Sequence, residues 1–323
     1  MAFTTRKTYR WQTTIVVVIF LFVLILCYWF LFIGQQAWLS TWVGAVGVAP
    51  DNVATYAKAV SWLVGIAVFL VSAYVLGKVP KWLQLLVTYL ELLMLLVLFM
   101  TTFNIDMDFI LRKLPFLITQ GAFTTLYVTV VSIALAFCLA LVTAIARRSS
   151  NGVAEGIATF YISLFRGLPL LLQIFILYLG LPQLGFVIKP IPVGIIALAL
   201  CYGAYMSEVI RAGIQAVPLG QWEAALALGL QRRQVMRRIV LPQALKIIIP
   251  PVGNHFISML KDSSLVSVVG VWELTYLSST LGNRDFKNLE MLITAAGVYW
   301  VITITLEVVQ RRIEHRFDSA RTR

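Results

Sequence analysis

The stretch that says most about the fold runs from Glu223 to Pro242 and reads EAALALGLQRRQVMRRIVLP. Small and apolar residues come first, Gly229 interrupts them, and pairs of arginines follow. Because glycine often takes the left-handed conformation that ends a helix, the pattern predicts two short helices separated at Gly229. We expect the first to cover Trp222 to Leu228, with Pro218 starting it and Glu223 in its first turn.

This basic stretch lies between two apolar segments, so its folding calls for an explanation. Ala224 and Ala225 carry almost no side chain and would let another protein surface approach closely. One interpretation is therefore a loop that another protein grips. The alternative is an amphipathic helix at the membrane surface, with its arginines on phospholipid headgroups.

The composition indicates a membrane protein. Of the 323 residues, 60% are hydrophobic and only 12% are charged, whereas soluble domains average about 25% charged residues. The net charge of +12 would suggest nucleic acid in a soluble protein, but here the basic residues flank apolar runs, so no nucleic-acid partner is expected. Cys27, Cys138 and Cys201 all lie inside apolar runs and are interpreted as buried hydrophobic residues.

The apolar runs predict an all-α, polytopic membrane protein with about eight transmembrane helices, because each can cross a hydrocarbon core of roughly 30 Å. The first run is too long for a cleaved signal peptide, so we expect an uncleaved helix. Ser263–Leu281 is rich in Ser, Thr and Gly, and is expected to be a re-entrant or surface element. The eight runs are Ile15–Ile33, Ala59–Gly77, Trp82–Phe103, Leu114–Ala146, Val153–Leu181, Pro190–Ser207, Ile239–Leu260 and Met291–Gln310.

Charge sets the expected orientation. With a cytoplasmic N-terminus and alternating spans, most of the 26 lysines and arginines fall at cytoplasmic ends, as the positive-inside rule requires. The C-terminus and the Arg232–Arg238 loop then also face the cytoplasm, and Gln35–Lys58 is external. A reading with seven or nine spans would move a basic cluster to the wrong side.

Four longer stretches, together with the opening one, resemble a known family. They are QGAFTTLYVTVVSIALAF (120–137), FRGLPLLLQIFILYLGLP (165–182), GAYMSEVIRAGIQAVPLGQWEAALALGL (203–230) and LPQALKIIIPPVGNHFISMLKDSSLVSVVGVWELTY (241–276). In order and spacing they resemble permeases of importer-type ABC transporters of the polar amino acid group, which includes histidine, glutamine and arginine permeases. The cytoplasmic loop of that family is matched by Glu223, Ala224, Ala225, Gly229, Ile239, Leu241 and Pro242.

The resemblance covers about Leu114 to Arg316 and implies a core of five spans. It divides the chain into an N-terminal extension of about three helices (residues 1–113), a type I ABC importer permease core (114–316) and a cytoplasmic tail (317–323). The role of the extension does not follow from its residues.

The resemblance also implies a mechanism and partners. A separate ATPase subunit would grip the loop, a second permease subunit, identical or a sister chain, would complete the path, and an extracytoplasmic amino-acid-binding protein would deliver substrate. The location would be the bacterial inner membrane. The chain has no G-x-x-x-x-G-K-[ST] motif, so ATP and magnesium are expected on the ATPase, and this chain is expected to be a transport subunit rather than an enzyme. Neither the amino acid nor the identity of the second permease is specified by these residues.

Ionisable side chains at membrane depth are costly and usually functional, so they are the candidates for the substrate path. Glu208 and Arg211 share a helical face with Tyr205, and we expect these three residues to line the path. A mutually neutralising pair near the cytoplasmic end is the alternative.

Other polar residues are expected to have simpler roles. Arg166 is expected to extend to the cytoplasmic boundary, and Lys261 and Asp262 to form a local ion pair. His255 and His315 stand alone in the sequence, and no ligands have metal-like spacing, so no metal site is expected.

A different class of transporter stays open. A secondary transporter driven by an ion gradient would use broken helices near the midplane, and Pro250–Pro251 could form such a break. No convincing internal repeat supports it, and such a transporter needs no ATPase-docking loop. An intramembrane enzyme would need a nucleophile with a base or a metal cluster, and neither is visible.

Overall fold

The structure is a computed structural model that describes residues 80–318. The expected spans Ile15–Ile33 and Ala59–Gly77, and the end of the expected tail, lie outside the described residues. The chain separates into two compact units between Ile105 and Asp106, and each is described by itself.

In the first unit the described part is α4, Lys81–Thr102, which confirms a helix at the expected run Trp82–Phe103. Its 22 residues span about 33 Å at 1.5 Å per residue. Pro80 precedes the helix, and Asn104, with a φ of 48°, follows it in the left-handed conformation.

Every regular element in the described part of the second unit is helical, as the sequence predicts. The sequence-based boundary between residues 113 and 114 falls inside α5 of this unit. The elements are α5 (Met107–Phe116), the π-helix η3 (Leu117–Ala122), α6 (Phe123–Ala146), α7 (Gly152–Gly167), α8 (Leu170–Gln183), α9 (Pro190–Gln215), α10 (Leu219–Ala227), α11 (Arg232–Val235), the π-helix η4 (Met236–Val240), α12 (Leu241–Asp262), the 3-10 helix η5 (Ser263–Val269), α13 (Leu274–Asp285) and α14 (Asn288–Asp318).

Three continuous helical segments of this unit are long and apolar enough to cross a membrane: Met107–Ala146, Pro190–Gln215 and Asn288–Arg316. Two bent pairs, one formed by α7 and α8 and the other by Arg232–Val269 and α13, raise the number to 5 if each counts as one span. That number agrees with the predicted five-span core. The prediction of about eight spans also includes runs outside the described residues.

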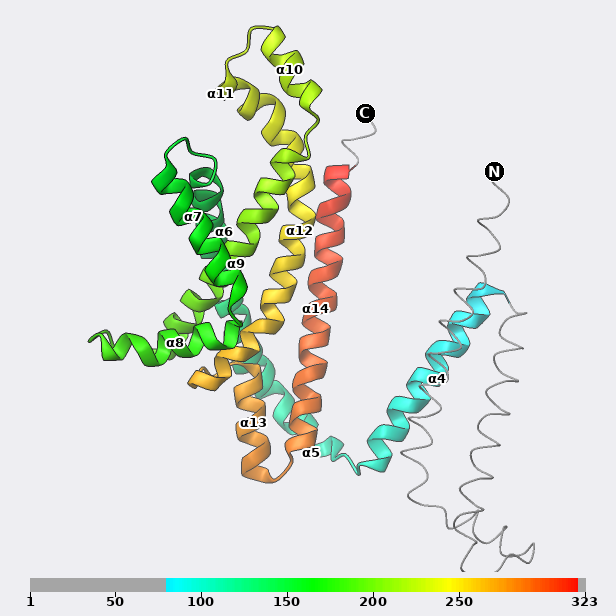
Figure 1. The fold of residues 1–323 in the computed structure, drawn as a ribbon. Coiled ribbons are helices and arrows are strands. Elements are labelled where there is room, and N and C mark those ends of the chain that lie inside the picture. Colours follow the sequence, from blue (N-terminus) through cyan, green and yellow to red (C-terminus); the bar gives the residue numbers. More distant parts are fainter. Residues whose placement is uncertain (1–79, 319–323) are drawn as a thin grey trace, which may run out of the picture. The chain divides into compact units, whose positions relative to one another are not determined.

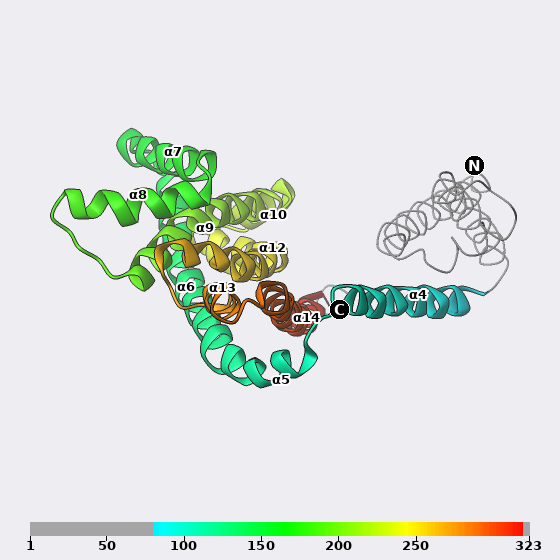
Figure 2. The same ribbon diagram turned by 90° about the horizontal axis from the view of Figure 1, so that it is seen from below.

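Helix α9 is the centre of the unit. It packs on α6, α7, α8 and α12, and Figure 2 shows α9 and α12 between α7 and α8 on one side and α14 on the other. Close packing depends on small residues, because a Cβ added at Gly213 would lie 2.3 Å from Ile248 of α12, and one at Gly194 would lie 2.8 Å from Val266. Small residues let helix backbones approach closely, as is common between membrane helices.

The expected span Val153–Leu181 is not one continuous helix, because α7 and α8 meet at an angle of 107°. The bend lies at Leu168, whose φ of −99° and ψ of 139° are extended. Pro169 follows it, and a residue before proline is pushed out of the helical region by steric clash.

Of the two forms expected for Ser263–Leu281, the surface element is wrong, and the re-entrant element stays a prediction. The segment forms η5 and the start of α13, at a bend of 51°, and Val266, Leu274 and Leu277 are buried. The side chain of Glu273 caps α13 by accepting hydrogen bonds from the backbone N–H groups of Thr275 (2.9 Å) and Tyr276 (2.7 Å).

Figure 1 shows α10 and α11 projecting beyond the other helices at one end of the second unit, with α5 and the α13–α14 turn at the opposite end. At that opposite end, Asp106 caps α5 and pairs with Lys287 at 3.3 Å. The hydrogen bond from the Phe109 N–H, followed by that from Lys287, lowers the pKa of Asp106, and Asp106 in turn raises the pKa of Lys287. The pair therefore joins the start of α5 to the start of α14.

Candidate functional site

The α10–α11 hairpin, residues 218–242, contains the family-like loop. Gly229 has a φ of 80°, which confirms the predicted left-handed helix end. The N–H of Leu230 donates to the carbonyl of Ala225 (3.2 Å), and the N–H of Gly229 donates to that of Leu226 (2.9 Å). These two bonds form a Schellman motif, which satisfies the last carbonyls of α10 and fixes the turn.

The start of α10 differs from the expected one. The helix begins at Leu219 with Pro218 as its N-cap, and no acidic residue lies in its first turn. Glu223 therefore lies in the second turn, and the predicted interaction with the helix N-terminus is wrong. The sequence signal for the earlier start is Pro218 itself, since a helix can begin immediately after a proline whose own N–H is missing.

The alanines of the hairpin divide into two roles. Glu223, Ala224 and Gly229 are exposed, whereas Ala225 is only 4% exposed and packs into the main core of the unit, to which Trp222 and Val235 also belong. The prediction that both alanines leave room for a partner is therefore wrong for Ala225. Ala225 instead lets the hairpin pack tightly on itself, so that the exposed edge is held rigidly.

The hairpin continues into α12 without a loop. Gln231 and Gln234 form a reciprocal capping box at the start of α11, and η4 then joins α11 to α12. Pro242 has no N–H to donate to the carbonyl four residues earlier, and the π-type turns of η4 end two residues before it. Ile239 is half-buried, whereas Leu241 and Pro242 are exposed at this junction.

Glu208 is held between two arginines. Arg147, at the end of α6, contacts one carboxylate oxygen, and the Nη2 atom of Arg211 lies 2.7 Å from the other. Arg211 also donates to Gln215 at 2.6 Å. The structure thus brings Glu208 and Arg211 together as the spacing predicts, and adds Arg147, which sequence spacing could not reveal because it lies 61 residues away. Whether Glu208 also lines a substrate path stays a prediction.

Tyr205 belongs to a separate cluster of polar and aromatic side chains between α7, α9 and α12. Its ring centroid lies 6.0 Å from His255 and 6.4 Å from Tyr202, and the guanidinium carbon of Arg166 lies 5.4 Å from the Tyr205 ring. The hydroxyl of Tyr202 donates to Asp262 at 2.6 Å. We name Arg166, Tyr202, Tyr205, His255 and Asp262 the aromatic cluster.

The aromatic cluster corrects two expectations. Arg166 lies near the end of α7, about 21 Å along the helix from the turn that joins α6 to α7. It therefore does not reach the membrane boundary at which α6 ends. Asp262 pairs with Tyr202, and no ion pair with Lys261 occurs among residues 80–318. His255, which has no metal-like ligand spacing in the sequence, packs edge-to-face on Tyr202.

Glu273 is the carboxylate that the sequence analysis missed. Its side chain is fully buried, and besides capping α13 it accepts a hydrogen bond of 2.7 Å from the hydroxyl of Tyr299 on α14. Buried carboxylates need such partners, so its role is to hold α13 against α14. Glu is not one of the usual N-cap residues, so the local sequence Val271-Trp272-Glu273 carried no signal for this role. In the part of the chain that the structure describes, no group of His, Cys, Asp or Glu side chains is placed to hold a metal ion.

Comparison with known proteins agrees with this geometry. Residues 136–319 match the family described as "Binding-protein-dependent transport system inner membrane component". The arginine transport system permease protein ArtQ of Bacillus subtilis is 38% identical over 217 residues, which cover 67% of this chain and 99% of that protein. The L-cystine transport system permease protein TcyB of the same organism is 39% identical over 203 residues, covering 62% of this chain and 87% of TcyB.

Solved structures show the same fold. An amino acid ABC transporter crystallised with histidines aligns with a TM-score of 0.63 and 36% identity, covering 66% of this chain and 99% of that chain. The MetNI methionine ABC transporter in an inward-facing conformation aligns with a TM-score of 0.54 at 19% identity, covering 62% and 96%, and therefore shows the fold alone. The hairpin, the helical core and these matches together show that the chain belongs to the family of binding-protein-dependent transport system inner membrane components, and is a multi-pass protein of the bacterial inner membrane.

Proposed function

We propose that this chain is the permease subunit of an ATP-driven amino acid importer, and that the α10–α11 hairpin couples it to a separate ATPase subunit. The observation that carries the proposal is the exposed, rigid edge of α10, at which Glu223, Ala224 and Gly229 are accessible while Ala225 anchors the helix. A rigid edge transmits force, since little of an applied movement is absorbed within the hairpin itself. The relatives named above are permeases for arginine and cystine, which supports amino acids as substrates.

The remaining partners follow from the same proposal. A second permease subunit, identical or a sister chain, completes the path, and an extracytoplasmic binding protein delivers the amino acid. ATP and magnesium bind to the ATPase subunit. The hairpin end, with Arg147, Arg211 and the arginines of α11, faces the cytoplasm together with both termini, because basic residues concentrate on that side.

The substrate path is proposed to follow α9. Tyr205 lies in the aromatic cluster, which contains a cation, Arg166, and an anion, Asp262, at membrane depth. A path that offers both signs suits a zwitterion better than an apolar pore. Glu208 and Arg211 lie one and two turns further along α9, where they would meet the substrate as it leaves toward the cytoplasm.

The test is reconstitution. The tagged chain is purified in mild detergent from its own cells, and we expect an ATPase with a phosphate-binding loop to accompany it in fixed stoichiometry. In liposomes the complex should take up labelled amino acids when the binding protein is outside and ATP inside, with ionophores having no effect.

An ion-gradient-driven transporter remains the alternative, because two of the spans in this unit are bent pairs. Uptake by the chain without any ATPase, driven by a sodium or proton gradient and abolished by ionophores, would establish that alternative and refute the proposal.

A further inference from the structure

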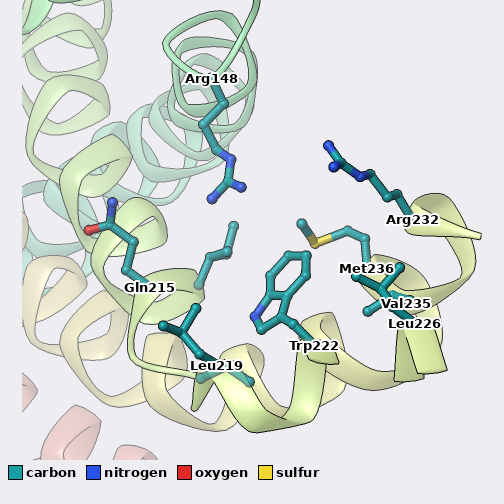
Figure 3. A pocket seen from close by; sticks show the side chains of 10 residues that line it. Arg148, Gln215, Leu219, Trp222, Leu226, Arg232, Val235 and Met236 are labelled. Carbon is teal, nitrogen blue, oxygen red and sulfur yellow. The ribbon is translucent and has the colours of Figure 1, made fainter. Parts of the chain in front are cut away.

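A pocket of about 600 Å³ lies where the α10–α11 hairpin meets the ends of α6 and α9. Its size falls within the range of sites for small organic ligands. Figure 3 shows the guanidinium groups of Arg148 and Arg232 both extending over the opening, with the side chains of Trp222 and Met236 beneath them. We name this space the hairpin pocket.

The charge of the hairpin pocket is one-sided. Arg148 and Arg232 form no salt bridge with any residue between 80 and 318, and no acidic side chain lines the pocket. Gln215, which also lines it, accepts from Arg211 through Oε1, so its amide nitrogen remains as a donor. The rim therefore offers donors and positive charge, and the floor is apolar.

The position of the pocket relative to the membrane surface restricts which ligands can enter it. Gln215 is the last residue of the membrane-spanning helix α9, and Arg148 follows the end of the span Met107–Ala146 by two residues. Both therefore lie where hydrocarbon gives way to headgroups. The cytoplasmic leaflet is rich in anionic lipids, which attract arginines at this depth.

We propose that the hairpin pocket binds the headgroup of an anionic phospholipid. The phosphate lies between Arg148 and Arg232, and the glycerol and first acyl carbons contact Trp222 and Met236. A zwitterionic headgroup, or a free amino acid, would bring an ammonium group that finds no carboxylate here, so the pocket prefers lipids with net negative charge. The inference rests on the proposed function only for placing this end of the molecule in the cytoplasm.

Quenching of tryptophan fluorescence by brominated lipids tests the proposal. The full chain is placed in nanodiscs containing equal fractions of brominated phosphatidylglycerol or brominated phosphatidylcholine. The sequence contains 9 tryptophans, so the signal of Trp222 is taken as the difference between wild type and Trp222→Phe. We expect Trp222 to be quenched more strongly by the phosphatidylglycerol.

Charge variants then assign the effect to the pocket. In the double variant Arg148→Gln with Arg232→Gln, the preference for phosphatidylglycerol should fall by at least about tenfold, equivalent to about 1.4 kcal/mol. Arg233→Gln is the matched control, because it removes the same charge from an exposed neighbour on α11 that does not line the pocket. If the double variant fails to fold, the single variants and the charge-preserving Arg148→Lys decide in the same assay.

Several results would overturn the proposal. They are equal quenching of Trp222 by the two lipids, a preference that survives loss of both arginines, and an equal loss in Arg233→Gln. Abolition of the preference by millimolar inorganic phosphate would indicate a site for bare anions. Absence of a co-purifying ATPase would instead contradict the proposed function, and would leave the lipid preference measurable.

Discussion

Gly229 allows the proposed coupling role of the hairpin to be separated from its folding. A Cβ at this position would have no heavy atom within 4 Å, so an added side chain meets no steric obstacle in the chain itself. The cost comes from the backbone alone, because a φ of 80° is unfavourable for residues with a side chain. That cost is about 1 kcal/mol for alanine and less for asparagine, which tolerates the left-handed region.

The expected results follow from the backbone cost of alanine at this position and the smaller cost of asparagine. The thermal midpoint of the isolated permease should fall by a few degrees in Gly229→Ala and by less in Gly229→Asn. Reconstituted ATP-driven uptake should nevertheless be lost in both variants, because either side chain projects from the exposed edge that the ATPase is proposed to approach. Gly185→Ala is the matched control, since Gly185 has a φ of 88°, equally open surroundings and a place outside the hairpin. It should match Gly229→Ala in stability and retain uptake.

Two outcomes would refute this reasoning. Near-normal uptake by Gly229→Asn would show that only backbone strain matters and that no partner closes on this edge. Equal loss of uptake in Gly185→Ala would attribute the defect to general instability.

Three further predictions concern packing and charge. Glu208→Gln should destabilise the permease by about 1–2 kcal/mol by releasing two arginines, and should also reduce uptake by the assembled complex because the proposed path loses its carboxylate; uptake that matches wild type at every substrate concentration would exclude Glu208 from the path. Gly213→Ala should cost about 1–3 kcal/mol in thermal unfolding, because its Cβ would lie 2.3 Å from Ile248, and adding Ile248→Ala should recover part of the loss. The lowered pKa of Asp106 means that its charge stabilises the fold above the unfolded pKa of about 3.9 and ceases to do so as the pH falls through the folded value. The difference in melting temperature between wild type and Asp106→Asn should therefore be present at pH 7 and vanish in acid; a difference that persists there would contradict a role for the Lys287 pair.

Local sequence signals predicted part of the fold. Gly229 indicated the turn of the hairpin, and Pro190 marks the start of α9 in both the prediction and the structure. The bend between α7 and α8 was missed, although Pro169 was present, because long apolar stretches continue on both sides of Arg166 and Pro169. An apolar run reports that a segment prefers lipid, but it does not report the direction of the helix axis.

Contacts between distant residues account for most of what the sequence analysis missed at the site. The pairing of Glu208 with Arg211 follows from helical spacing, whereas the contact with Arg147 depends on how α6 packs on α9. Tyr202 and Asp262 are likewise 60 residues apart, and nothing near either residue indicates the other. Glu273 lies next to a bend that hydropathy could not place, so its burial could not be anticipated.

The construction of α12 has a mechanical consequence. Pro250 and Pro251 lie in its middle, and each removes one helical hydrogen bond, which leaves a compliant joint. On the hairpin side of the two prolines, the continuous helix from Arg232 to Ile249 is about 27 Å long and includes the second half of the hairpin. It can therefore act as a lever arm. A rotation of about 10° at the joint displaces the tip of that arm by about 5 Å, taking the arm length from the helical rise. Gln310 of α14 donates to the carbonyl of Pro250 at 3.3 Å, so the joint is held against a neighbouring span, and under the proposed coupling a pull on the hairpin would tilt this arm rather than slide it.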